Sequence, residues 1–179
     1  MRSAAIVAAA DGVSSYSPST PGLRFAAKTS TDEAERMLSL TRTNMKELYD
    51  ACPEAEWRWS DSDKLKSFFN VKSRFFFLEN YSAFICFRFL VDAKRPVAYI
   101  YELQVDPLHL GKGIGRQLVE ELERLCRELA PAISHCVLTC FKTNVGAINF
   151  YKKLGFDIDK ATSPTSPTCS YIILSRSIR

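Results

Sequence analysis

The sequence predicts a single α/β domain, built on a mixed and mostly antiparallel sheet of about seven strands flanked by about four helices. Three observations support this fold class. The length of 179 residues is typical of one domain. The middle of the chain holds three successive β-type runs separated by short turns. The second half alternates helical and β-type patterns, which adds helices to the same sheet.

The first 21 residues are rich in Ala, Ser and Pro, so we expect a flexible N-terminal tail and a folded domain over 22–179. No run is long and apolar enough to cross a bilayer. The weakly apolar start is not typical of a secretory signal. The sequence therefore predicts no membrane association and a place in the cytoplasm and nucleus. A first short strand is expected at 23–28.

Two helices are expected next. Ser30, with Glu33 three residues later, forms a capping box that begins the first of them. The apolar face of this helix comprises Met37, Leu38, Thr41, Met45, Leu48 and Tyr49. Pro53 ends it. Residues 54–59 form a loop or short turn, and a second short helix runs from residue 62 or 63 to residue 70.

Three β-type runs fill the middle of the chain. Residues 74–78 are almost continuously apolar, and residues 81–91 are rich in aromatic and β-branched side chains. The third run is 97–105. Tight turns at 79–80 and 93–96 separate the runs, so neighbouring strands are predicted to pair antiparallel.

The second half contains the clearest helix. One of its faces is apolar through Leu118, Leu122, Leu125, Cys126 and Leu129. Pro131 ends it. A shorter helix is expected over 144–154, with Gly155 in the position that commonly ends helices. A loop is expected at 160–168. The remaining strands are expected at 136–141, 156–158 and 170–175.

Three glycines, Gly111, Gly113 and Gly115, lie between the third β-type run and the long helix. The first amides of a helix have no partner within it, and the helix dipole places partial positive charge there. Small residues let a phosphate approach those amides closely. This loop therefore predicts a binding site for a phosphate-bearing ligand.

Composition narrows the classes of function. The formal net charge of +4 suits a phosphorylated cofactor but is too weak to indicate nucleic acid binding. The six cysteines form no Cys-x-x-Cys pair and the chain has only two histidines, so we expect no metal site. Without a secretory signal the cysteines are expected to be reduced thiols, several of them in the core.

Two motifs resemble those of the GNAT superfamily of N-acetyltransferases. The loop that begins at Leu110 is similar to the family's cofactor loop, Arg/Gln-x-x-Gly-x-Gly/Ala. The second family motif, Asn-x-x-Ala-x-x-Phe-Tyr-x-x-x-Gly-Phe, is intact as Asn144, Ala147, Phe150, Tyr151, Gly155 and Phe156. The motifs stand in the family's order, with one helix and one strand between them. The resemblance implies a GNAT-like fold, acetyl-CoA as cosubstrate and acetyl transfer to an amine.

Further segments are similar to the NatD family, the N-terminal α-amino acetyltransferases of histone H4 and the 2A-type histone. They lie at 43–49, 56–59, 87–89, 99–104, 138–142 and 169–176. This narrower resemblance spans residues 38–176. It implies histone N-terminal tails as substrate and association with the ribosome. We also expect a monomer.

The resemblance also assigns an acetyl-CoA site. The pantetheine arm would lie along the backbone of Leu103, Gln104 and Val105. The pyrophosphate would lie on Gly111, Lys112, Gly113, Ile114, Gly115 and Arg116, with Asn144 as a further contact. Taken alone, Lys112 and Arg116 also fit solvated cations. Asn144 also fits a helix N-cap.

Glu102 is the candidate general base. It lies within an apolar strand, and by alternation it shares a face with Ile100 and Gln104. A carboxylate there is either close to a ligand or part of an ion pair on the strand. The resemblance to NatD favours the base. Tyr151 stands where many relatives place the general acid, and the alternative is a ring packed on the sheet.

The acceptor site is expected to be formed mainly by aromatic side chains. Its predicted members are Tyr49, Trp57, Asp92, Tyr99, Tyr101, Thr139 and Tyr171. Without the resemblance these aromatics fit a core. NatD carries two carboxylates after its Phe-Arg-Phe segment. Here those positions hold Leu90 and Asp92, so one acid remains to bind an arginine of the substrate.

Two other functions are open at this point. One is a GNAT enzyme for a lysine side chain or a small amine, and the other is a CoA-binding module without activity. Leu110 stands where the family has Arg or Gln and supports the second of these. Most pyrophosphate contacts in such a loop come from backbone amides, so we expect weaker acetyl-CoA binding rather than none.

Overall fold

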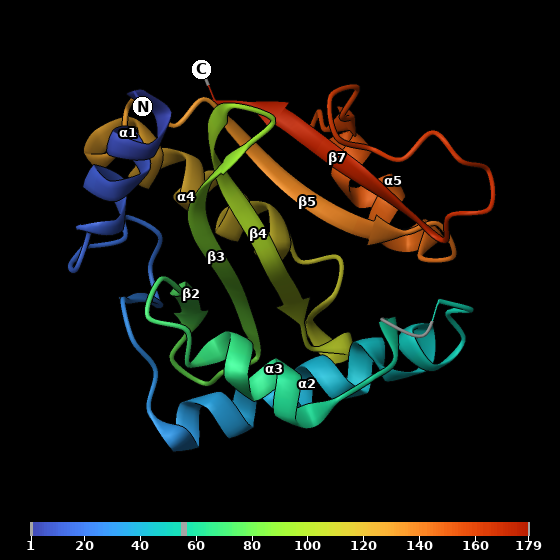
Figure 1. Cartoon of the computed structure of the whole chain (residues 1–179). Coiled ribbons are helices and arrows are strands. Elements are labelled where there is room, and N and C mark those ends of the chain that lie inside the picture. The colour runs from blue at the N-terminus through green and yellow to red at the C-terminus, as the bar shows by residue number, and fades with distance from the viewer. Residues whose placement is uncertain (1, 55–56, 179) are drawn as a thin grey trace.

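A seven-stranded sheet runs through the centre of the protein, with helices on both of its faces (Figure 1). The computed structural model describes residues 2–54 and 57–178, so Glu56 of the segment 56–59 lies outside the described residues. The helices are α1 (Arg2–Asp11), α2 (Thr31–Asp50), α3 (Asp61–Phe68), α4 (Ile114–Leu129) and α5 (Val145–Lys153). The strands are β1 (Leu23–Ala26), β2 (Arg74–Leu78), β3 (Ala83–Asp92), β4 (Arg95–Val105), β5 (His135–Phe141), β6 (Asp157–Ile158) and β7 (Tyr171–Ser177).

The sheet has the strand order β1-β2-β3-β4-β5-β7-β6. Only the pair β4 and β5 is parallel; the other neighbours are antiparallel. Parallel neighbours need a crossover connection, and α4 supplies it between β4 and β5. The predicted fold class, a mixed and mostly antiparallel sheet in one α/β domain, is confirmed.

The strand β2 is buried on both faces, which explains the almost continuous apolar run 74–78. Phe75 and Phe77 pack with α2 and α3, in a cluster that also contains Phe68. Phe76 lies between them in the chain and faces the other way, in the larger cluster with α4 and α5. Alternation along a strand places successive side chains on opposite faces, so an unbroken apolar run fills both layers.

The helix boundaries follow their caps. Ser30 and Glu33 form the predicted capping box: Glu33 N donates to Ser30 Oγ at 3.3 Å, and Ser30 N donates to Glu33 Oε2 at 2.8 Å. The short helix α3 begins slightly earlier than expected, because Ser60 is its N-cap and accepts from the amide of Asp63 at 3.2 Å. It also ends earlier, at Phe68 rather than at residue 70.

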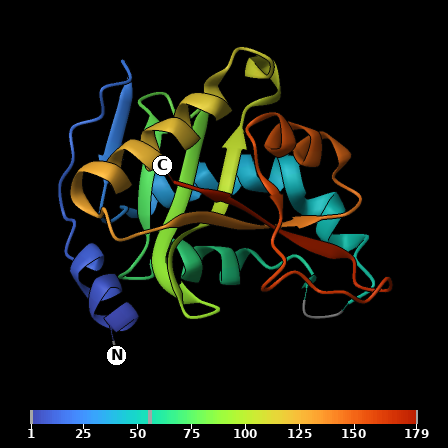
Figure 2. The same ribbon diagram turned by 90° about the horizontal axis from the view of Figure 1, so that it is seen from above.

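The N-terminal segment differs from the expected flexible tail. Residues 2–11 form α1, which packs against β3 and β4 (Figure 1, Figure 2). Val7 and Ala10 are buried in the larger core cluster. The Arg74 guanidinium then donates to the carbonyl oxygens of Asp11 at 2.5 Å and Val13 at 2.9 Å. Asp11 is the last residue of α1 and Val13 follows it closely, so a buried cation fixes the C-terminal end of the helix to the sheet.

A second buried charge holds the segment after α1. Glu121 of α4 is fully buried and accepts hydrogen bonds from the Tyr16 hydroxyl at 2.9 Å, the Ser19 amide at 3.0 Å and the Thr20 hydroxyl at 2.7 Å. Burial alone would raise the pKa of Glu121, but these hydrogen bonds lower it overall. Composition could not reveal this anchor, because its acceptor lies about a hundred residues away in the chain.

Glu121→Gln is expected to destabilise the protein by about 1–3 kcal/mol at pH 7, because charge-assisted hydrogen bonds are lost from a buried site. The folded-state pKa of Glu121 is depressed. Its contribution is therefore present above the ordinary glutamate pKa of about 4.3 and is lost as the pH falls through the folded value. Urea unfolding at pH 7 and at lower pH measures the gap between the two proteins, which should close on acidification.

Glu120→Gln is the matched control, since Glu120 lies on the same helix with half of its side chain exposed. Its effect is expected within about 0.5 kcal/mol. Equal stability of Glu121→Gln and the wild type at pH 7 would contradict the role of this carboxylate as an anchor.

Candidate active site

The strands β4 and β5 separate part-way along the sheet. They are paired from Val97 with His135 to Ile100 with Leu138, and β4 then continues to Val105 paired with β3 but not with β5 (Figure 1). Beyond that point the facing backbone edges of β4 and β5 are not paired with each other, which leaves room for another partner between them. The opening lies beside the glycine loop that follows β4.

A bulge in β4 brings Glu102 to this opening. Glu102 lies opposite Cys86 across the β3–β4 pair. The next pair along is Ile100 with Phe87, which leaves Tyr101 as the extra residue on β4. Ile100 belongs to the core cluster of α4, whereas Glu102 contacts α3. The prediction that these two share a face was wrong, because an inserted residue breaks the alternation.

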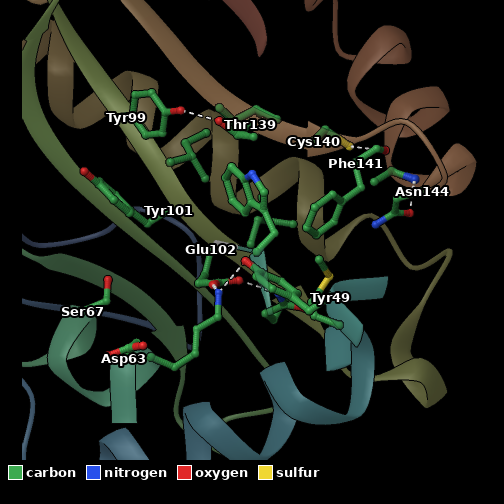
Figure 3. Close-up of a pocket in the computed structure, with 18 of the residues that line it drawn as sticks. Tyr49, Asp63, Ser67, Tyr99, Tyr101, Glu102, Thr139, Cys140, Phe141 and Asn144 are labelled. Carbon is green, nitrogen blue, oxygen red and sulfur yellow. Dashed lines mark hydrogen bonds and ion pairs between the residues drawn. The ribbon is translucent and has the colours of Figure 1, made fainter. Parts of the chain in front are cut away.

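Both carboxylate oxygens of Glu102 have partners. The side chain is 8% exposed. Its Oε1 accepts from the Lys64 ammonium at 2.5 Å, and its Oε2 accepts from the Gln104 amide at 2.8 Å. The same ammonium donates to the Tyr49 hydroxyl at 2.6 Å. The ion pair that the sequence left open as an alternative is therefore present, and it lies in a cavity beside Tyr49 (Figure 3).

The electrostatics of this cluster favour a fixed ammonium. Burial of Lys64 opposes its charged form, but the charge of Glu102 and the hydroxyl of Tyr49 outweigh burial and raise the pKa of Lys64. Burial, with a contribution from the Glu102 charge, also raises the pKa of the Tyr49 phenol. At neutral pH the site thus holds a lysine cation and a neutral phenol.

A cavity of about 370 Å³ surrounds this cluster. The predicted acceptor residues that line it are Tyr49, Trp57, Tyr99, Tyr101 and Thr139 (Figure 3). The Tyr49 ring lies edge-on to Phe141, with centroids 5.0 Å apart, and the Tyr99 and Thr139 hydroxyls are 2.5 Å apart. These rings come from α2, from the loop before α3, and from β4 and β5, so the aromatic residues form the wall of a cavity.

Two predicted acceptor residues lie outside that lining. Tyr171 packs behind Trp57, with ring centroids 5.1 Å apart. Asp92 ends β3, where the Arg95 guanidinium is 3.6 Å away. Asp92 lies six positions further along β3 than Cys86, roughly 20 Å of extended strand. A role of Asp92 in binding a substrate arginine stays a prediction.

A second cavity, of about 610 Å³, lies at the glycine loop and the N-terminus of α4. The predicted cofactor residues that line it are Leu103, Gln104, Val105, Gly111, Gly113, Ile114, Gly115, Arg116 and Asn144. Lys112 is exposed and lies outside this lining, as a solvated cation would. Leu110 does line the cavity, and the cations Arg116 and Lys153 border it.

Two of the glycines have different physical roles. Gly113 is the N-cap of α4 with a φ of +81°, a left-handed conformation that other residues adopt only with strain. It leaves the first amides of the helix uncovered by a side chain. A Cβ on Gly115 would lie 3.0 Å from the Phe150 ring, so this glycine permits close packing of α4 against α5.

Asn144 and Tyr151 stand between the two cavities and line both. Asn144 caps α5 by accepting from the Ala147 amide at 3.1 Å, so its role as an N-cap is confirmed and its contact with the cofactor stays a prediction. Tyr151 is 7% exposed and packs against Phe156, with centroids 5.4 Å apart. Burial strongly raises the pKa of the Tyr151 phenol.

Sequence reasoning missed several side chains of the site. Asn44 on α2 donates to the Gln104 side chain and to the Val105 carbonyl, each at 3.0 Å, and so ties α2 to the end of β4. Lys64 was treated only as part of a helix. Both are polar residues of amphipathic helices, for which a solvent-facing position is the default reading, and only tertiary packing turns them inward.

Within residues 2–54 and 57–178 no group of three or more His, Cys, Asp or Glu side chains is arranged to hold a metal ion. In the same part of the chain no helix has the length and apolar character needed to span a membrane. The cavities therefore offer backbone amides, cations, one buried carboxylate and aromatic walls as their chemistry.

Comparison with known proteins identifies the fold. N-alpha-acetyltransferase 40 of Saccharomyces cerevisiae is 37% identical over 85 residues, which span 44% of this chain and 30% of that protein. The PaiA N-acetyltransferase of Thermoplasma acidophilum, solved in complex with coenzyme A, superposes with a TM-score of 0.61 at 20% identity and covers 87% of this chain and 98% of its own. Arabidopsis thaliana NAA60, in complex with a bisubstrate analogue, gives a TM-score of 0.63 at 14% identity, with 88% and 99% covered.

The two solved structures share the fold of this chain. The family model described as the acetyltransferase (GNAT) family matches residues 34–156, which include β4, the glycine loop, α4 and α5. These segments form the second cavity and the boundary between the two. The chain belongs to the GNAT family of acetyltransferases.

Proposed function

We propose that this chain is an N-terminal α-amino acetyltransferase that takes acetyl from acetyl-CoA and modifies the N-terminal serine of histone H4 and the 2A-type histone. The observation that carries the proposal is the pair of adjoining cavities. One is formed around a helix N-terminus, and the other contains the buried carboxylate of Glu102. Their common boundary includes Leu103, Asn144 and Tyr151, which gives a donor and an acceptor a place to meet.

The residues of the larger cavity fit acetyl-CoA. The uncapped amides at Gly113 suit a pyrophosphate, and the cations Arg116 and Lys153 complement its charge. The edge of β4 beyond Ile100 is not paired with β5, so its backbone groups suit the amides of a pantetheine arm. The structure thus supports acetyl-CoA as the cosubstrate, as the family implies.

Acetyl-CoA supplies the acetyl group as an activated thioester. Glu102 accepts the proton that the acceptor amine must lose, a role open to a carboxylate because an α-amino group has a pKa near 8. Tyr151 is a neutral phenol at the cavity boundary and serves as the proton donor for the leaving thiolate. The aromatic wall excludes water around the acceptor amine.

The histone substrate rests on two supports. Segments across the acceptor cavity resemble NatD, and the yeast relative is named an N-alpha-acetyltransferase. Because the match spans only 30% of that relative, its substrates and partners are proposals for this chain. A tail beginning Ser-Gly-Arg-Gly presents a small first residue, which suits a cavity of about 370 Å³. We place the enzyme in the cytoplasm and nucleus as a monomer that associates with the ribosome.

Glu102→Gln is expected to lower kcat for a Ser-Gly-Arg-Gly peptide by about 10²–10⁴-fold, because the amide preserves shape but cannot take the proton. Mass spectrometry of the peptide after reaction with acetyl-CoA measures the rate. The exposed turn residue Glu79 provides the control Glu79→Gln, which should leave the rate unchanged. A folded Glu102→Gln protein with wild-type turnover would remove Glu102 as the base.

Acetyl-CoA at 100 times its dissociation constant is expected to stabilise the protein by about 2.7 kcal/mol, seen as a rise in Tm.

Gly113→Ala and Gly155→Ala each place a Cβ at a positive φ and should each cost about 1–2 kcal/mol of stability. Only Gly113 lines the larger cavity, so only its variant should also weaken acetyl-CoA binding. Equal affinity of the two variants in a titration would contradict the proposed position of the pyrophosphate.

A further inference from the structure

Among the residues that the structure describes, four charged side chains line the acceptor cavity: Arg58, Asp63, Lys64 and Glu102. Arg58 is exposed, and the Asp63 side chain is 70% exposed and paired with Lys66. Lys64 and Glu102 are 15% and 8% exposed. Over residues 2–54 and 57–178, the buried charge of the cavity therefore consists of one ammonium and one carboxylate in direct contact.

Lys64 is held in place from three sides. Its ammonium contacts the carboxylate of Glu102 on β4 and the hydroxyl of Tyr49 on α2. It also lies 4.3 Å from the centroid of the Tyr49 ring and 5.7 Å from that of Trp59, in cation–π geometry. These contacts raise the pKa of Lys64 despite its burial, so the ammonium keeps its proton. It is a permanent cation and a poor nucleophile.

An acceptor amine that approaches Glu102 also approaches this cation. When two positive charges lie within about 4–6 Å of each other, their repulsion favours loss of a proton from the group with the lower pKa. An α-amino group has a pKa of about 8 and a lysine side chain about 10.4, so at neutral pH the neutral fraction of the first is roughly 250-fold larger. A cavity with a fixed cation therefore admits an α-amine far more readily than a lysine ε-amine.

We propose that Lys64 is a specificity-determining residue, the fixed cation that makes this cavity select N-terminal α-amines over lysine side chains. The inference rests on the proposed function and deepens it, because it states which kind of amine the site accepts and why. Lys64 neither gains nor loses a proton in the reaction. It acts through its charge on the acceptor and through its hold on Glu102.

The test compares the wild type with Lys64→Met, Lys64→Arg and the control Lys66→Met. Lys66 lies two residues further along α3, and its side chain is 76% exposed. Two acceptors are used: a Ser-Gly-Arg-Gly peptide with a free N-terminus, and an N-terminally blocked peptide of the same length with one internal lysine. The measured quantities are kcat and KM for each acceptor at pH 7, with acetyl-CoA in excess.

In Lys64→Met the ratio of kcat/KM between the free N-terminus and the lysine peptide should fall at least tenfold. Both KM and kcat for the free N-terminus should fall, because an acceptor ammonium now binds Glu102 but keeps its proton. A merely structural role would instead raise KM. Lys64→Arg should retain the discrimination, and Lys66→Met should match the wild type. If Lys64→Met does not fold, Lys64→Gln replaces it, since a glutamine can still donate to Glu102.

An unchanged ratio in a folded Lys64→Met or Lys64→Gln protein overturns the inference, and so does a lysine peptide that stays inert with wild type and variant alike. The proposed function fails in a different way. A wild-type protein that acetylates the lysine peptide and leaves the free N-terminus unmodified contradicts N-terminal acetylation itself. The two failures are therefore distinguishable with the same acceptors.

Discussion

The separation of β4 from β5 is the constraint on which the rest of the site depends. Four residue pairs hold the two parallel strands together, and the strands then part at Ile100 and Leu138. The bulge at Tyr101 begins at the same place and directs Glu102 into the opening. Both cavities meet along this opening, because Leu103 and Gln104 line each of them. One irregularity in an otherwise regular sheet thus creates the backbone edge, the buried carboxylate and the space between donor and acceptor.

Buried charges hold the surrounding segments in place. Arg74 fixes the end of α1, Glu121 fixes the segment that follows it, and Lys64 joins α3 to β4. Each charge is surrounded by hydrogen-bond partners, which is the condition under which burial of a charge is tolerated. The partners come from segments distant in the chain, so these contacts fix tertiary positions rather than local structure. The acceptor cavity differs only in that its charged pair remains next to an open space.

Much of the fold could be predicted because local signals were strong. The capping box at Ser30, the apolar run 74–78 and the amphipathic face of α4 all gave the correct element. The predictions failed where tertiary contacts override composition. An Ala-rich start reads as a tail, yet α1 is stabilised by a core that no local pattern reveals. A bulge adds one residue without a composition change, so the face of Ile100 relative to Glu102 could not be counted from alternation.

In the candidate site, too, the residues that belong to a local sequence pattern could be predicted, and those placed by tertiary contacts could not. The glycine loop and the motif that begins at Asn144 are each short local sequence patterns, so their residues could be predicted as cofactor residues. The aromatic wall could be predicted only with the help of the family resemblance, because tyrosine and tryptophan pack into cores as readily as they line cavities. Lys64 and Asn44 lie on polar helix faces, and their inward position depends on how α2 and α3 rest on the sheet.

The parallel pairing of β4 with β5 constrains some parts of the site and leaves others free to vary in sequence. A hairpin cannot join parallel neighbours, so the chain must leave β4, begin α4 and cross over to β5. The proposed donor site includes the first part of that connection, the glycine loop and the N-terminus of α4, which the topology requires. The acceptor walls come partly from β4 and β5 and partly from α2, α3 and the loop between these helices, and the helical part is not restricted by such a connection. Changes there can redirect the choice of acceptor while the donor machinery and the fold stay the same, so the scaffold is evolvable on one side only.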